Sequence, residues 1–302
     1  MKVVIVMQLN THFSYKANFL RANKTNKSEQ KDFVMKPKSL KVITLLSIFF
    51  MVSNSQASLI SYDLLAPNAS TNISYSNQFT NAFSSSKDGF QIYQQDQTFN
   101  IPRNLLDKGT AVTKDSLGIV TKSNKDAFFG IVDTVNQDNT SSDAVATWQI
   151  NIANLSAITF LADMAAMGDF ESSDWFEWRY SVDNKPFTRL FQGITNDSTL
   201  QQYDLADGSS VTLFDPMTVN STLLGNKFTT FASPNLTTGN LLTIELKAKV
   251  NSDSEVIAFQ NVVLQAENNA VVVSEPTPLV LMFFTLLFVM TNQPLSRRLR
   301  IN

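Results

Sequence analysis

The chain has 302 residues, a formal net charge of −2, no cysteine and one histidine, His12. Without cysteine it forms no disulfide, no thiolate metal site and no cysteine nucleophile. His12 precedes the region that we expect to be mature, so Ser–His–Asp and Cys–His catalysis and the usual zinc sites are excluded there.

The first predicted element is a secretory signal peptide at residues 35–57. Its basic segment, residues 35–41, precedes the apolar run 42–52, and small residues follow up to Ala57. This order is typical of a signal that is removed on export, so we expect signal peptidase to cut between Ala57 and Ser58.

Residues 1–34 precede this signal, although a signal peptide should begin the chain that it exports. The favoured explanation is that Met35 is the true start and that residues 1–34 are a wrongly assigned, disordered upstream extension. An unusually long basic segment in front of the signal is the alternative.

Residues 58–265 are predicted to form one all-β domain. Residues 241–250 give the clearest pattern, because apolar and polar residues alternate along the whole stretch. Similar short stretches predict further strands at residues 147–152, 158–160, 176–182, 211–214 and 256–264. Turn-forming pairs fall between them, and short strands with frequent turns indicate a β-sandwich.

Two stretches of this domain have weaker patterns. The polar residues 58–110 are interpreted as the opening strands and loops of the same sandwich. Residues 220–231 are expected to hold a short helical or irregular turn.

The predicted domain is acidic, because many of the basic residues lie in the segments outside it. A protein that binds nucleic-acid phosphates needs a basic patch, so we expect no nucleic-acid partner. An acidic surface is compatible with cations or neutral sugars as ligands.

Four carboxylates fall within one apparent loop, residues 162–174; they are Asp163, Asp169, Glu171 and Asp174. Calcium takes six to eight oxygen ligands, often from carboxylates that are closely spaced along a loop. The spacing matches no EF-hand, and acidic turn residues are commonly only solvated. A solvated loop and a calcium site that holds the loops in place both stay open.

Aromatic residues gather directly after this loop. Alternation places Phe176, Trp178 and Tyr180 on one face of a strand, where we expect them in the core. Trp175 falls on the other face between two carboxylates. An exposed tryptophan in that setting is suited to stacking on a sugar ring, so Trp175 is a candidate sugar contact. Packing of all these aromatic residues inside the sandwich is the alternative.

Glycoside hydrolysis, which uses paired carboxylates, is the enzymatic alternative. Glu171 and Glu177 are the only glutamates near the acidic loop, and alternation points Glu245 outward to solvent. We therefore favour a non-catalytic protein and keep a carboxylate-based glycan hydrolase or lyase as the rival.

Four segments follow one another in an order that is found in a known family: Ala162–Glu171, Trp178–Asp183, Phe228–Phe231 and Ile257–Val262. Over residues 162–264 this order resembles an accessory β-sandwich module of secreted bacterial proteins, including some extracellular nucleases. The resemblance implies a jelly-roll fold but no nuclease activity, because the catalytic domain is missing. The chain has Gln260-Asn261 where such modules often have Asp-Asn, which weakens any metal site that depends on that aspartate.

The tail after a short linker, residues 266–273, has a Glu-Pro motif, an apolar run at residues 279–290 and a basic end. Its key residues are Ser274, Glu275, Pro276, Arg297, Arg298 and Arg300. Residues 274–302 resemble the PEP-CTERM sorting signal, which the membrane transpeptidase exosortase recognises in some Gram-negative bacteria. Ser274 stands where that family usually has proline.

The apolar run is shorter than the roughly 20 residues of a full membrane span. Neighbouring Thr and Asn residues would have to extend it, and the arginines would stay on the cytoplasmic side. That topology places the preceding domain outside the inner membrane. A buried terminal helix of the domain is the alternative.

The sequence thus predicts an exported protein that is transiently anchored in the membrane and then sorted to the cell surface or the extracellular space. Its expected processing partners are signal peptidase and an exosortase-type transpeptidase. We expect a non-catalytic binding or structural role in the envelope or matrix, with extracellular polysaccharide as the candidate ligand and calcium as the candidate cofactor. A scaffold without any ligand is a further alternative.

Overall fold

The computed structural model describes residues 58–79, 83–95, 101–108, 116–139 and 143–268, together with Met282. The predicted signal peptide up to Ala57 and the predicted sorting residues from Ser274 onward lie outside the described residues, Met282 excepted. Within the described part of the chain, no helix is long and apolar enough to cross a membrane. Residues 54–275 form one compact unit, and the description below concerns this unit.

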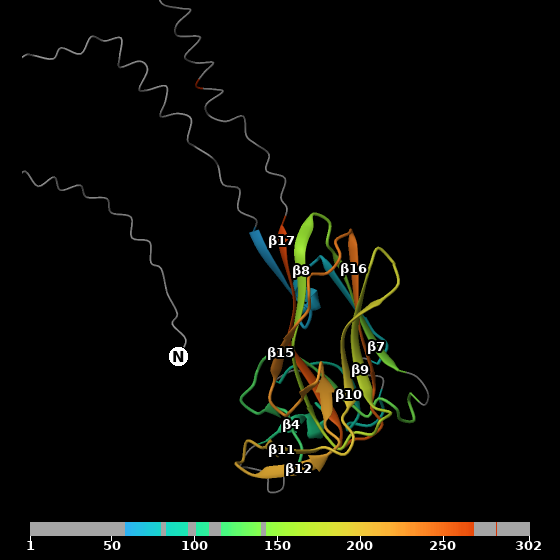
Figure 1. Cartoon of the computed structure of the whole chain (residues 1–302), viewed down its shortest axis with the longest axis vertical. Helices are drawn as coiled ribbons and strands as arrows, with labels where there is room; N and C mark the ends of the chain where they lie inside the picture. Colours follow the sequence, from blue (N-terminus) through green and yellow to red (C-terminus); the bar gives the residue numbers. More distant parts are fainter. Residues whose placement is uncertain are drawn as a thin grey trace, which may run out of the picture. The chain divides into compact units, whose positions relative to one another are not determined.

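The unit consists of strands with two short 3-10 turns (Figure 1). In chain order the elements are β1 (Ser58–Asp63), η1 (Pro67–Ala69), β2 (Ile73–Asn77), β3 (Gly89–Tyr93), η2 (Arg103–Leu105), β4 (Leu106–Asp107), β5 (Val120–Thr121), β6 (Phe128–Val132), β7 (Ala144–Asn151), β8 (Leu155–Met167), β9 (Trp175–Val182), β10 (Thr188–Thr195), β11 (Leu200–Asp204), β12 (Ser210–Phe214), β13 (Met217–Val219), β14 (Thr222–Leu223), β15 (Thr229–Ala232), β16 (Leu241–Lys249) and β17 (Val256–Asn268). The all-β prediction is confirmed.

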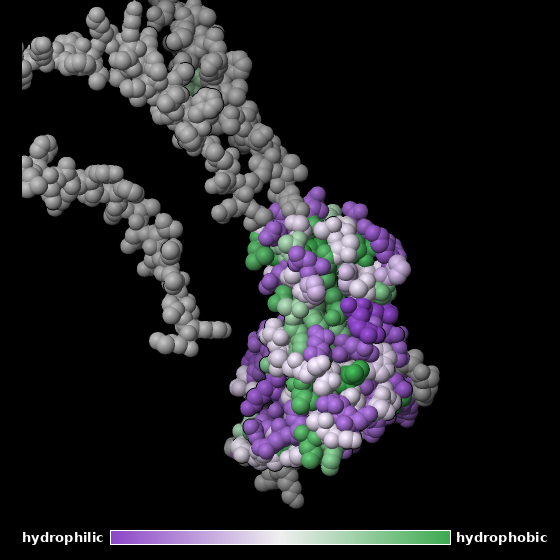
Figure 2. Space-filling view, viewed as in Figure 1, coloured by the Kyte–Doolittle hydropathy of each residue, from purple (hydrophilic) through white to green (hydrophobic). Residues whose placement is uncertain are grey.

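Two antiparallel sheets make up most of the unit. The six-stranded sheet has the order β15-β8-β17-β6-β3, with β1 also paired to β17, and the seven-stranded sheet has the order β14-β13-β10-β9-β16-β7-β2. Figure 1 shows β8 and β17 on one side and β16, β9 and β7 on the other. In Figure 2 polar residues cover most of the same view, and apolar residues form a narrow band between the two sheets.

The inner faces of the sheets share one aromatic core. The ring of Trp178 on β9 lies 5.1 Å from that of Phe160 on β8 and 5.3 Å from that of Phe259 on β17, measured between centroids. Phe176 and Trp178 are fully buried as predicted, whereas Tyr180 is half-buried at the edge of this core. Because the rings come from both sheets, their burial holds the sheets face to face.

A second apolar cluster covers the outer face of the six-stranded sheet. Ala165 and Met167 of β8 pack there with Tyr203 and Leu205 from the β11–β12 hairpin. The end of β8 is therefore buried on both faces. Ala165, Ala166 and Met167 are each 0% exposed, so the alternation that reveals a half-exposed strand is absent there.

This double burial explains the main error in the predicted strands. The strand expected at residues 158–160 is the 13-residue β8. Residues 162–167 of the predicted acidic loop therefore belong to a strand, and the loop itself spans only residues 168–174.

Two further boundaries differ from the prediction or refine it. β17 continues to Asn268 because its last residues pair with β1, so the linker predicted at 266–273 starts too early. Residues 220–231 hold the short strands β14 and β15 rather than a helix, which agrees with the irregular alternative.

Candidate functional site

A gap in the six-stranded sheet opens beside β17, which changes its partner along its length. β6 pairs with β17 up to Gln260, and β1 pairs with it from Val263 onward. Between these two residues the register shifts, and Asn261 has a φ of 48°. Asparagine tolerates this left-handed conformation better than most residues. The gap between β1 and β6 forms one side of a cleft.

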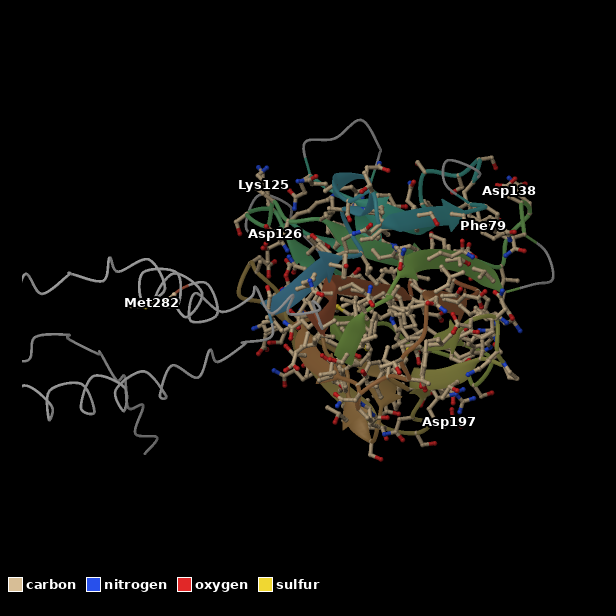
Figure 3. All side chains as sticks on the ribbon, turned by 90° about the horizontal axis from the view of Figure 1, so that it is seen from above. Phe79, Lys125, Asp126, Asp138, Asp197 and Met282 are labelled. Atoms are coloured by element: carbon tan, nitrogen blue, oxygen red, sulfur yellow. The ribbon has the colours of Figure 1, made fainter. Side chains whose placement is uncertain are left out.

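The cleft has a volume of about 960 Å³ and lies between this gap and the strands β2 and β3. Its polar lining comes from five parts of the chain and includes Asp63, Tyr75, Gln91, Gln94, Asp126 and Asn261. Figure 3 labels Asp126 beside Lys125, on the side of the unit where the blue strand β1 lies. Residues that are far apart in sequence thus meet at one surface.

One contact within the seven-stranded sheet and one between the two sheets fix the lining. The ring of Tyr75 on β2 packs against the buried Trp148, with 5.1 Å between centroids. Asn77 donates a hydrogen bond of 2.6 Å from Nδ2 to the backbone oxygen of Phe90 on β3. Because β2 and β3 belong to different sheets, this bond holds the cleft walls at a set separation.

Hydrogen-bonding capacity remains unused in the cleft. Gln91 is 9% exposed, and its Oε1 has no hydrogen-bond partner within the described part of the chain. A buried acceptor of this kind normally has a hydrogen-bond partner, so this oxygen is an unmet acceptor in the wall of the cleft. The described lining contains two carboxylates, Asp63 and Asp126, and no lysine or arginine. The cleft therefore suits a neutral, hydroxyl-rich ligand and disfavours an anion.

A separate group of carboxylates lies at the connections between the sheets. Glu171 and Asp174 belong to the β8–β9 connection, and Glu255 ends the β16–β17 connection. One oxygen from each lies within 4.8 Å of the others. Glu171 is exposed, whereas Asp174 and Glu255 are each 1% exposed.

Within this cluster, burial raises two pKa values and hydrogen bonding lowers the third. Burial raises the pKa of Glu255 to about 10, and a hydrogen bond to Glu171 adds to the shift. Burial also raises the pKa of Asp174 to about 6. The hydrogen bond from Glu255 lowers the pKa of Glu171. In the absence of a cation, Glu255 therefore keeps its proton at neutral pH and shares it with Glu171.

Of the four residues predicted for calcium, only two lie in this cluster. Glu171 and Asp174 lie together, but Asp163 points elsewhere from β8. Both its oxygens accept hydrogen bonds, from Thr230 Oγ1 at 2.5 Å and Asn261 Nδ2 at 2.6 Å. Asp169 is exposed and lies outside the cluster. The prediction grouped Asp163 with the other carboxylates because it placed this residue in a loop, whereas Asp163 lies on β8.

Glu255 was missed because it lies far from Asp174 in the sequence. A signal for it exists: it ends a polar run, residues 251–255, directly before the fully apolar start of β17. A carboxylate at the entry to a buried strand has little room to reach solvent.

Trp175 lies on the outer face of the seven-stranded sheet and is half-buried. The Lys247 ammonium lies 5.7 Å from its ring centroid, and Trp175 does not line the cleft. Its role as a sugar contact stays a prediction. Glu245 lies on the outer face of β16 as predicted, since its neighbours Ile244 and Leu246 are in the core, but it forms an ion pair with Arg179 and is not simply solvated.

Comparisons with known proteins add little to this geometry. No model of a protein family matches the chain, and no curated protein sequence matches it. Among solved structures, the chain is similar to the enzymatically active domain of tailspike protein 4 from bacteriophage CBA120, with 12% identity and a TM-score of 0.22. The match covers 70% of this chain but only 19% of that one.

Proposed function

We propose that this protein is a non-catalytic glycan-binding protein of the cell surface, and that it holds a neutral polysaccharide in the cleft beside β17. The observation that carries the proposal is the cleft itself, whose volume of about 960 Å³ is lined by amides, carboxylates and tyrosine. This volume falls in the range of about 300–1,000 Å³ that is usual for ligand sites.

The chemistry of the lining supports a sugar. Tyrosine offers an apolar ring face with a polar tip, and its ring can cover the C–H face of a pyranose. Tyr75 is held half-exposed at such a position by Trp148. Gln91 and Gln94 supply amide groups that pair with hydroxyls. The absence of basic residues from the described lining favours a neutral polysaccharide over an acidic one.

The positions of the carboxylates support binding rather than catalysis. In the cleft, Asp63 Oδ1 accepts a hydrogen bond of 2.8 Å from the Leu65 amide, and Asp126 Oδ2 accepts one of 3.2 Å from Gln260. These bonds give both residues an anchoring role in the chain.

A glycan hydrolase or lyase is the second candidate. The opposite pKa shifts of Glu171 and Glu255 favour it, because acid–base pairs in enzymes are tuned in this way. However, none of the cluster residues lines the cleft, and burial of Asp174 and Glu255 keeps a polymer from reaching them.

We further infer that the sandwich is a jelly roll. Its strands β6 to β10 and β15 to β17 follow the orders β6-β17-β8-β15 and β7-β16-β9-β10. These are the two four-stranded sheets of a jelly roll, an architecture that occurs in lectins and capsid proteins. The fold is compatible with glycan binding, but the function rests on the cleft.

The cellular location rests on the sequence signals at residues 35–57 and 274–302. Intact-mass analysis of the protein from its native cells tests both. The expected mature chain begins at Ser58 and ends near Glu275, because signal peptidase and the transpeptidase remove the flanking segments. A chain that keeps its tail would contradict sorting by a transpeptidase.

The binding proposal is tested with residues 54–275, which form a compact unit. Affinity electrophoresis in gels that contain glucan, galactan, mannan, alginate or hyaluronan should show retardation by at least one of the three neutral polymers. Tyr75→Ala and Gln94→Ala should weaken that binding by about 2–10-fold each, the loss expected from one or two contacts.

Gln202→Ala is the matched control, since this glutamine is exposed on β11 and does not line the cleft. It should bind as the wild type does. Retardation only by the two acidic polymers, or equal binding by all variants, would contradict the cleft. Release of new reducing ends from a bound polymer would favour the hydrolase instead.

A further inference from the structure

We propose that Glu171, Asp174 and Glu255 form a calcium site that joins the two connections crossing between the sheets at one end of the sandwich. The β8–β9 connection carries the first two residues, and the β16–β17 connection carries the third. The site is distinct from the cleft and does not depend on the proposed glycan binding.

The spacing of the carboxylates fits one calcium ion. Oxygen ligands lie about 2.3–2.6 Å from calcium, so two ligands on opposite sides of the ion are about 4.6–5.2 Å apart. One oxygen from each of the three residues lies within 4.8 Å of the other two. A single ion can therefore contact all three without a large movement of the backbone.

Two oxygens in the cluster are buried. Asp174 Oδ1 and Glu255 Oε2 are enclosed, and outside the cluster no group among the described residues donates a hydrogen bond to either. Within the same residues, no lysine or arginine forms an ion pair with the cluster. Burying carboxylates without such partners is costly, and a bound cation offsets that cost.

The rest of the site is held in place by the protein. Asp174 Oδ2 accepts a hydrogen bond of 2.8 Å from the Glu171 amide, and Thr195 Oγ1 donates one of 2.6 Å to the backbone carbonyl oxygen of Glu171. A Cβ atom on Gly168 would lie 2.9 Å from Glu255 Cα, so the absence of a side chain there lets the two connections touch. The ligands from both connections are thus positioned before an ion arrives.

The donor set selects the kind of ion. All three ligands are carboxylates, which suit hard cations rather than zinc or copper. Calcium accepts irregular geometry and six to eight oxygens, and the exposed side of Glu171 leaves room for water to complete the shell. Magnesium needs shorter bonds and a regular octahedron, so we expect it to bind more weakly.

The alternative is a cluster that has only a structural role, in which Glu255 shares a proton with Glu171 and no ion binds. Calorimetric titration of residues 54–275 with calcium chloride, after removal of metals by a chelator, distinguishes the two. We expect one site with a Kd of about 10⁻⁴–10⁻³ M, the range of extracellular calcium modules. Saturating calcium should also raise Tm by roughly 5–10 °C.

Glu255→Gln and Asp174→Asn keep the size of each side chain but remove a ligand charge. Each should weaken calcium binding at least tenfold and abolish most of the rise in Tm. Because both remove a buried acid, neither should lower Tm in the presence of the chelator, which shows that the variants are folded. Asp169→Asn is the matched control, since this exposed carboxylate lies in the same connection but outside the cluster.

Several results would overturn the site. The proposal fails if millimolar calcium gives neither heat nor a change in the Tm of the wild type. It also fails if Asp169→Asn loses as much affinity as Glu255→Gln, since binding would then reflect general surface charge. Equal affinity for magnesium and calcium would contradict a calcium-selective site and indicate a general site for divalent cations.

Discussion

Individual acidic residues in this protein serve very different purposes, and Asp133 and Asp183 make the contrast clear. Both have a left-handed backbone, with φ of 39° and 53°. Asp133 Oδ1 has no hydrogen-bond partner among the described residues. Asp183 Oδ1 accepts hydrogen bonds of 2.9 Å from the amides of both Asn240 and Leu241. The negative charge of Asp133 is therefore unfavourable in the folded protein, whereas that of Asp183 is favourable.

The two residues should respond to pH in opposite directions. Burial raises the pKa of Asp133 to about 6, so the folded protein binds this proton more tightly than the unfolded chain does. Its contribution to stability is full at low pH and is lost as pH rises from about 4 to about 6. Asp133→Asn should therefore raise Tm at about pH 7.5, and the gain should shrink as pH falls towards about 4.

Asp183→Asn provides the matched comparison, because asparagine also tolerates the left-handed conformation. The hydrogen bond from the Leu241 amide lowers the pKa of Asp183. Its stabilisation is present above the pKa of the unfolded chain and is lost as pH falls. Asp183→Asn should thus lower Tm at neutral pH. Thermal melts at several pH values would refute the assignment if both variants shifted Tm in the same direction.

At the scale of single elements, β16 and β9 could be predicted from alternation, whereas most of β8 could not. β16 and β9 alternate in sequence because their outer residues, such as Glu245 and Arg179, lie outside the core and form an ion pair with each other. β8 was mostly missed because its end is covered on both sides, which removes the period of two. Alternation of apolar and polar residues indicates a strand with one exposed face. It is lost where a second layer of the chain covers the outer face as well.

The close approach of β9 and β10 requires a glycine at one position. Gly193 on β10 lies opposite Phe176 on β9, and a Cβ at Gly193 would lie 2.1 Å from Phe176 Cε1. Phe176 is fully buried and packs against Phe259 at 5.0 Å between centroids, so it has little freedom to move.

Gly193→Ala should therefore lower the free energy of unfolding by about 1–3 kcal/mol, the usual cost of overpacking. Gly225→Ala is a suitable control, because the atoms nearest to its Cβ would be Gln201 Nε2, at 3.2 Å and at the end of a side chain, and Lys227 N, at 4.0 Å. Urea unfolding measures both. Equal stability of the two variants would mean that Phe176 can move away from Gly193.

At the scale of the whole molecule, the candidate sites arise from segments that the fold brings together. The cleft combines β1, β2, β3 and the bulge at Asn261, and the carboxylate cluster combines two connections that are remote in sequence. Glu171 and Asp174 could be predicted because they are neighbours in one loop. Glu255 and the cleft could not, because no local pattern records which strand ends meet.

The glycan-binding cleft is the central claim, and the most direct test compares Gln94→Ala with Trp175→Ala in residues 54–275. Isothermal titration with a neutral polysaccharide that retards the wild type in gels gives the affinity of each. If the cleft is the binding site, Gln94→Ala weakens binding by about 2–10-fold and Trp175→Ala leaves it unchanged. If Trp175→Ala abolishes binding while Gln94→Ala has no effect, the outer face of the seven-stranded sheet is the site and the cleft is not.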